Sequence, residues 1–238
     1  MVSPHHTTTR IAMVGGGSHA IKPGACSLAH YGVLFVDEAP ECGPGVLDAL
    51  RQPLESGTIT IARSVGNLTF PAQFLLVLAA NPCPCGKFTG RGHNCTCTSQ
   101  QVRRYLGKLS GPLMDRIDLR VQVEPVGRVD MARNELGETS ETIRQRVINA
   151  RAIAEKRFAG MGWSLNSQIP ARALRSTFQP ERKAMNFLHD ELDREQITAR
   201  GLHKIIRTSW SFADLHGHPV PTMQDVEAAH AMRGKVEA

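Results

Sequence analysis

Long apolar runs are missing from this sequence, and so is the kind of start that a secreted protein has. No stretch of about 18 consecutive apolar residues occurs, which argues against a membrane-spanning helix. The first six residues, Met-Val-Ser-Pro-His-His, provide neither the basic start nor the apolar core of a signal peptide. We therefore expect a cytoplasmic protein without a membrane partner.

A second absence concerns phosphate binding. The sequence contains no Gly-x-x-x-x-Gly-Lys-Ser/Thr loop, the P-loop whose backbone N–H groups and lysine hold the phosphates of a nucleotide. The glycine-rich run at 15–18 ends in a serine, but no lysine precedes that serine. Any nucleotide site in this chain has to be argued from other residues.

What is present is the composition of a soluble globular protein. The chain has 238 residues, 41% hydrophobic and 21% charged, which is enough for one two-lobed domain or two small domains. The formal net charge is +6 and the isoelectric point is near 9.2. This balance permits a polyanionic partner, although a solvated surface explains it equally well.

The most informative segment is Gly32–Glu38, where four apolar residues run directly into two carboxylates. The apolar run suits a buried parallel strand, and side chains that follow such a strand lie where α/β sheets bind ligands. This is the form of a Walker B segment. In it, Asp37 would hold the Mg²⁺ of a nucleoside triphosphate and Glu38 would polarise the attacking water. A strand that ends in an acidic turn is the simpler alternative.

Four of the six cysteines are clustered: Cys83, Cys85, Cys95 and Cys97 form Cys-x-Cys-x9-Cys-x-Cys. In a reducing compartment this pattern favours a metal over disulfides, and four thiolates satisfy a tetrahedral, structural Zn²⁺. A loop of free thiols is the alternative. The residues around the cluster are basic and either contact nucleic-acid phosphates or are merely solvated: Lys87, Arg91, His93, Arg103 and Arg104.

Hydrophobic periodicity divides the chain into an α/β part and a helical part. Strands are predicted over 33–37, 74–80 and 117–123, with a β-hairpin over 58–63 and 67–71. After a linker at 125–130, helices are predicted over 140–158, 170–178, 180–193, 198–215 and 222–232. The predicted domains are an α/β core at 1–125, a linker with a long helix at 126–164, and a helical domain at 165–238.

Three further side chains suit phosphoryl transfer, which needs a residue to orient water and cations to offset developing charge. Asn81 follows the second predicted strand and is placed for the first role. Arg116 suits an arginine finger that reaches a neighbouring subunit, and Arg200 begins a helix from which it could meet phosphate. Taken singly, each has a plainer role as a strand cap, an ion-pair partner or a solvated residue.

Several runs in this order resemble the carboxyl-terminal part of magnesium-chelatase-like AAA+ proteins of the competence protein ComM/YifB type. The resemblance covers essentially the whole chain, and its most specific run is Asn-Pro-Cys-Pro-Cys-Gly at 81–86. The Walker B segment also carries it, together with the runs at 4–7, 15–18, 27–30, 50–57 and 109–119.

This resemblance implies an incomplete AAA+ parallel-sheet core with an inserted β-hairpin at 58–71, followed by an all-helical lid. It also implies ring hexamers that hydrolyse ATP with Mg²⁺, some of which act as DNA branch-migration motors. DNA contacts would then fall on Arg10, Lys22 and Arg63. Family members carry the P-loop ahead of this region, so the chain is either the back part of a longer ATPase or a domain that has lost nucleotide binding. We expect no hydrolysis by this chain alone.

Two other functions stay open on the sequence. A chelatase-type ATPase would remodel a protein partner instead of DNA. A non-enzymatic fragment held together by zinc would at most lend Arg116 to a complete neighbour in a mixed ring. Stimulation of the ATPase by branched DNA, with a P-loop restored, would separate the motor from the chelatase-type enzyme.

Overall fold

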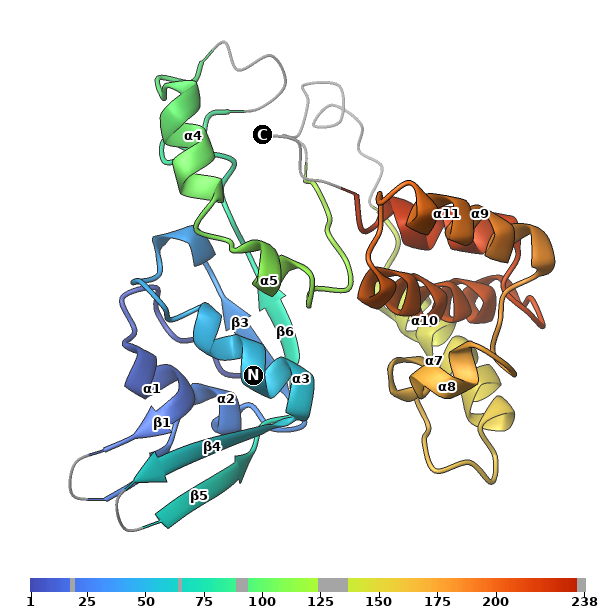
Figure 1. Ribbon diagram of the computed structural model, residues 1–238, viewed down its shortest axis with the longest axis horizontal. Helices are drawn as coiled ribbons and strands as arrows, with labels where there is room; N and C mark the ends of the chain where they lie inside the picture. The colour runs from blue at the N-terminus through green and yellow to red at the C-terminus, as the bar shows by residue number, and fades with distance from the viewer. Residues whose placement is uncertain (18–19, 64–65, 89–93, 124–136, 235–238) are drawn as a thin grey trace. The chain divides into compact units, whose positions relative to one another are not determined.

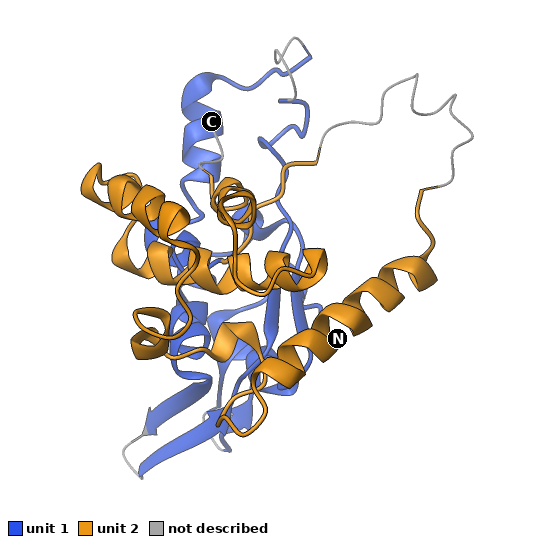
Figure 2. Ribbon diagram, turned by 90° about the vertical axis from the view of Figure 1, so that its right-hand side faces the viewer, with its two compact units in different colours: residues 1–117, 238 blue, residues 118–237 orange. Residues whose placement is uncertain are grey.

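The computed structural model describes residues 1–17, 20–63, 66–88, 94–123 and 137–234, in two compact units (Figure 1, Figure 2). The first unit comprises Met1–Ile117 and the second Asp118–Glu237. The three-part division at residues 125 and 165 stays a prediction, and the linker at 125–130 lies outside the described residues. Within the described part of the chain, no helix is both long enough and apolar enough to cross a membrane.

A small parallel sheet organises the first unit. β3 (Val33–Val36) and β6 (Leu75–Leu78) pair in parallel, with Val36 opposite Leu78. On its other edge β3 forms a bridge between Leu34 and Val2. The described residues place no further strand beside β6. This mixed α/β arrangement is consistent with the AAA+-like fold that we expected.

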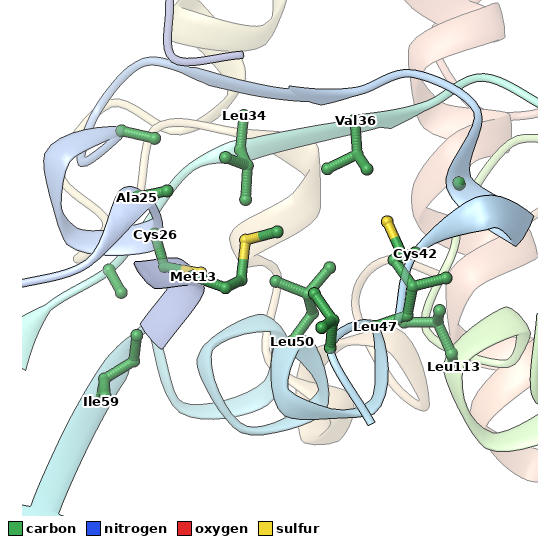
Figure 3. Close-up of a cluster of buried hydrophobic side chains, with 14 residues drawn as sticks. Met13, Ala25, Cys26, Leu34, Val36, Cys42, Leu47, Leu50, Ile59 and Leu113 are labelled. Carbon is green, nitrogen blue, oxygen red and sulfur yellow. The ribbon is translucent and has the colours of Figure 1, made fainter. Parts of the chain in front are cut away.

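Short helices pack their apolar side chains under this sheet (Figure 3). Leu34 of β3, Met13 of α1 and Leu50 of η2 are fully buried there. Because these side chains come from segments far apart in the sequence, long-range packing holds the short helices in place. These helices are α1 (Arg10–Val14), α2 (Ala25–Leu28), η1 (Ala39–Glu41), η2 (Asp48–Leu50), α3 (Arg51–Ser56) and α5 (Gly111–Met114). The same unit also contains α4 (Ser99–Leu106), which contributes no side chain to this core.

Two antiparallel strand pairs extend from the same unit (Figure 1). β4 (Thr58–Arg63) pairs with β5 (Gly66–Pro71), and β1 (Gly15–Gly16) pairs with β2 (Lys22–Pro23). The two pairs are neighbours, since a Cβ added to Gly15 would lie 3.1 Å from the side chain of Ile61 in β4. That β4 and β5 are the inserted β-hairpin implied by the family resemblance stays a prediction.

The second unit is helical and has an aromatic core. The Phe178 ring lies 5.7 Å from Phe158 and 5.6 Å from Trp210, and the indole N–H of Trp210 donates to the Phe178 carbonyl at 3.0 Å. Such rings bury large apolar areas, which lets a few residues fix several helices. The helices are α7 (Ser140–Arg157), η3 (Asn166–Gln168), α8 (Ala171–Leu174), α9 (Arg182–Asp193), α10 (Ala199–His216) and α11 (Met223–Ala231).

The strand predicted over 117–123 is wrong, because this segment has no regular secondary structure. Its apolar residues alternate as in a strand, yet Leu119 and Val121 are 51% and 70% exposed, and no described strand pairs with them. The segment instead lies along the helical unit. Asp118 forms an ion pair with Lys204 of α10 at 2.5 Å, and the Arg120 N–H donates to the Met232 carbonyl.

Candidate nucleotide and metal sites

The predicted water-activating and magnesium-binding residues follow the two parallel strands. Asp37 and Glu38 come directly after β3, and Asn81 comes three residues after β6. Val36 and Leu78 lie opposite each other in a parallel pair, so the segments that follow both strands leave the sheet at its carboxyl end. The structure therefore brings these predicted residues to one end of the sheet. Asp37 and Asn81 are exposed there, and Glu38 is half-buried.

The backbone at Glu38 is held in an unusual conformation. Its φ of 49° and ψ of 41° are left-handed, which is unfavourable for a residue with a side chain. Two hydrogen bonds hold this turn: the Glu38 N–H donates to Asp37 Oδ1 at 2.8 Å, and the Ala39 N–H donates to the Ala79 carbonyl at 2.9 Å. The turn directs the Glu38 carboxylate toward His6, whose Nδ1 lies 2.7 Å from Oε2.

His6 is a residue that our sequence argument missed. Its run at 4–7 contributed to the family resemblance, but nothing in the sequence alone pairs it with Glu38. The contact arises because Val2 joins the edge of β3 and brings the following residues beside the carboxyl end of that strand. A histidine at hydrogen-bonding distance can fix the orientation of a carboxylate.

Arg116 lines a groove of about 730 Å³ in the first unit. Its side chain is only 12% exposed; it forms an ion pair with Glu55 at 2.5 Å and donates to the Pro112 carbonyl at 2.8 Å. In a single chain the guanidinium is thus held by its own unit. Arg200 is the second residue of α10 in the helical unit and is exposed.

The four clustered cysteines come together in the folded chain. The Sγ atom of Cys83 lies 3.3 Å from that of Cys85 and 3.7 Å from that of Cys95, and Cys85 and Cys95 are 3.6 Å apart. The Cys97 sulfur completes a group whose four ligand atoms all lie within 4.8 Å of one another. Cys83 is buried and the other three are half-buried.

This spacing fits a tetrahedral zinc ion. With Zn–S bonds of about 2.3 Å, the sulfur atoms of a Cys₄ site lie about 3.8 Å apart. The local electrostatics also favour one thiolate, because backbone N–H groups of Thr96 and Lys87, with the Cys83 thiol, lower the pKa of Cys85 to about 5. Burial raises the pKa of Cys95 to about 12, so an ion would have to displace its proton.

Sequence comparison supplies the class of protein to which these sites belong. The family described as magnesium chelatase, subunit ChlI, matches residues 1–131, and the one described as its C-terminal part matches residues 137–233. The chain therefore belongs to the magnesium chelatase-like family.

Individual relatives place it nearer to one branch of that family. Competence protein ComM of Haemophilus influenzae is 43% identical over 90% of this chain and 41% of its own length. Protein YifB of Escherichia coli is 38% identical over 97% of this chain and 44% of its own length. An uncharacterized Mycobacterium tuberculosis protein, Rv2897c, is 45% identical over 98% of this chain. The chain spans less than half the length of each of these relatives.

Proposed function

We propose that this chain is the carboxyl-terminal part of an AAA+ ATPase that acts on DNA in transformation or recombination, as a branch-migration or helicase-type motor. The convergence of Asp37, Glu38 and Asn81 at one end of the parallel sheet carries the proposal. In a complete site Asp37 would hold Mg²⁺, while Glu38 and Asn81 would polarise and orient the water. Membership of the magnesium chelatase-like family and the likeness to competence protein ComM support it.

The phosphate cradle has to come from outside these 238 residues, because the sequence contains no P-loop. The open edge of β6 suits such a contribution, since Leu75 and Val77 of this strand are 64% and 37% exposed. A P-loop strand paired with β6 would cover these side chains and place its phosphate-binding loop beside Asp37.

The first experiment is to read the DNA immediately upstream of the Met1 codon and to express any longer protein that it encodes. We expect a Gly-x-x-x-x-Gly-Lys-Ser/Thr loop in frame and ATP hydrolysis that Glu38→Gln abolishes. Glu41→Gln, which removes a nearby carboxylate on η1, is the matched control and should leave turnover unchanged. Hydrolysis by the 238-residue chain alone, or turnover that survives Glu38→Gln, contradicts the proposal.

We assign DNA contacts to α1 and to the two strand pairs of the first unit. Arg10 at the start of α1 and Lys22 of β2 are exposed, and both of these elements contact β1. Arg63 is the third predicted contact, but its side chain lies outside what the structure describes. Phosphate contacts release counterions, so DNA binding should weaken steeply as salt rises.

A double variant tests this assignment. Arg10→Ala with Lys22→Ala should lower the slope of log affinity against log salt by about 1.8, from about 0.9 for each phosphate contact on duplex DNA. The control, Arg182→Ala with Lys183→Ala, removes equal charge from the exposed start of α9 and should leave the slope unchanged. Binding that does not vary with salt, or ATPase unaffected by branched DNA in the longer protein, would favour a protein partner.

The remaining assignments complete the proposed machine. Cys83, Cys85, Cys95 and Cys97 would hold one structural Zn²⁺, whose four protein ligands leave no position for a substrate. In a ring of six copies, Arg116 would leave Glu55 and reach the nucleotide of a neighbour, and Arg200 would meet its phosphate. Glu55→Gln should then raise ATP turnover of the longer protein, whereas Arg116→Ala should abolish it.

A further inference from the structure

A second group of metal-binding side chains lies in the helical unit, at the turn between α10 and α11. Asp225, in the first turn of α11, is fully buried although it is a carboxylate. His216 ends α10, and His218 follows it after Gly217, whose left-handed φ of 74° allows the tight turn. The turn brings both imidazoles to the same carboxylate.

The hydrogen bonds at Asp225 are unevenly divided between its two oxygens. Oδ2 accepts from the backbone N–H and the hydroxyl of Thr222, both at 2.9 Å, and lies 2.8 Å from His218 Nδ1. Oδ1 lies 2.7 Å from His216 Nδ1, its one side-chain hydrogen bond among the described residues. Oδ2 therefore takes part in three hydrogen bonds, two of them from Thr222, whereas Oδ1 takes part in one and keeps a second lone pair.

We propose that His216, His218 and Asp225 bind a divalent first-row transition ion such as Zn²⁺, separately from the cysteine cluster. One ring nitrogen from each histidine and one carboxylate oxygen lie within 4.8 Å of one another. Metal–ligand bonds of 2.0–2.2 Å require these donors to be about 3.4 Å apart in a tetrahedral site, a distance that small side-chain rotations reach. Two imidazoles with one carboxylate suit such ions.

The surroundings fit a three-ligand site with an open position. The His216 and His218 side chains are 50% and 34% exposed, so water can complete the coordination. Thr222 holds the carboxylate from behind, as outer-shell residues hold metal ligands. Because the three ligands come from the end of one helix and the start of the next, a bound ion would fasten α10 to α11 and stabilise the helical unit by mass action.

Counting ions by native mass spectrometry tests the proposal. The full chain is stripped with a chelator and then given Zn²⁺; His216→Ala with His218→Ala should bind one ion fewer than the unmodified chain. His189→Ala, which removes an exposed histidine from α9, is the control and should bind as many ions as the unmodified chain. Equal ion counts in the double variant and the unmodified chain overturn the proposal.

Cobalt separates this site from the cysteine cluster. Co²⁺ held by thiolates gives sulfur-to-metal absorption in the near ultraviolet, which Cys83→Ser with Cys85→Ser should remove without removing the ion bound by the histidines. A loss of all bound metal in this cysteine variant would contradict a separate site. Loss of the thiolate absorption, with one ion still bound, would support two separate metal sites.

A chemical probe makes the test independent of any variant. Diethyl pyrocarbonate modifies accessible histidines, and mass spectrometry locates the products in the unmodified chain. Zn²⁺ should slow modification of His216 and His218 at least tenfold and leave His189 unaffected. Equal modification of all three with and without Zn²⁺ would show that these side chains do not hold the ion.

Discussion

The two units of this molecule are built in opposite ways. The longest described helix of the first unit is α4, with eight residues, and its core draws on many short segments around β3. The second unit contains helices of 12 and 18 residues, α9 and α10, around an aromatic cluster. Short elements depend on distant partners for their stability, whereas long amphipathic helices carry more of it locally.

Function follows the same division. All three groups that we assign to nucleotide, DNA and structural zinc lie mainly on the first unit, at turns and strand ends held by long-range contacts. The second unit contributes Arg200 and the histidine cluster, both at helix ends. The division also supplies separate probes, because all six cysteines lie in the first unit and both tryptophans, Trp163 and Trp210, in the second.

The largest effect should come from breaking a buried ion pair in the second unit. Arg157 forms an ion pair with Asp214, whose side chain is 2% exposed. The Arg157 guanidinium also lies 4.3 Å from the centre of the Trp210 ring. Arg157→Met leaves the Asp214 charge buried and unpaired, so the free energy of unfolding should fall by about 3–5 kcal/mol. Urea unfolding followed by tryptophan fluorescence measures this.

The double variant Arg157→Met with Asp214→Leu removes both charges and is the control for this pair. It should recover much of the lost stability, because the cost lies in the uncompensated charge. Thiol reactivity of the first unit should stay unchanged in both variants. An Arg157→Met chain as stable as the unmodified one would show that the pair contributes nothing.

A matched pair of core truncations tests whether the two units unfold independently. Leu50 in the first unit and Leu188 in the second are both completely buried. Leucine-to-alanine changes at such positions cost about 2–5 kcal/mol. We expect Leu50→Ala to speed thiol labelling of buried Cys26 and Leu188→Ala to shift the tryptophan transition, each without affecting the other probe. Equal shifts in both probes would mean that the units unfold as one.

The same contrast explains what could be predicted from the sequence. The hydrophobic periodicity of the second unit predicts its long helices. The apolar run before Asp37 predicts a parallel strand that is followed by carboxylates, as β3 is. The strand expected at 117–123 fails although its alternation is regular. Alternation shows only that a segment suits a sheet, and a strand forms only where a neighbour pairs with it.

Contacts between distant or irregular segments could not be predicted. The approach of His6 to Glu38 depends on a bridge between Val2 and Leu34, which no local pattern encodes. The cysteine cluster was predictable because four thiols at close spacing in the sequence suit a single metal ion. The histidine cluster has no such signal, since His-Gly-His becomes a site only when Asp225 packs behind it.

Zinc removal should affect the first unit alone if the cysteines hold the ion. At free zinc 100 times the dissociation constant, binding stabilises the folded state by about 2.7 kcal/mol. In a His216→Ala chain with His218→Ala, which lacks the second cluster, a chelator should therefore destabilise the first unit and leave the tryptophan transition in place. Urea unfolding followed by circular dichroism and by tryptophan fluorescence measures the stability of both units. A chelator that shifts neither would leave the cysteines as free thiols.

The smallest effect concerns His203 on α10. Burial, and then the nearby charges of Arg207 and Arg175, lower the pKa of this histidine below its ordinary value of about 6.5. As the pH falls below about 6.5 the unfolded chain takes up a proton that the folded chain resists, so the second unit should lose stability until the folded pKa is reached. His203→Gln should reduce this loss in fluorescence-detected unfolding at pH 7.5 and 5.5, whereas His189→Gln, which changes an exposed histidine of α9, should not. If both variants keep the full pH dependence of the unmodified chain, the destabilising proton binds elsewhere in the helical unit.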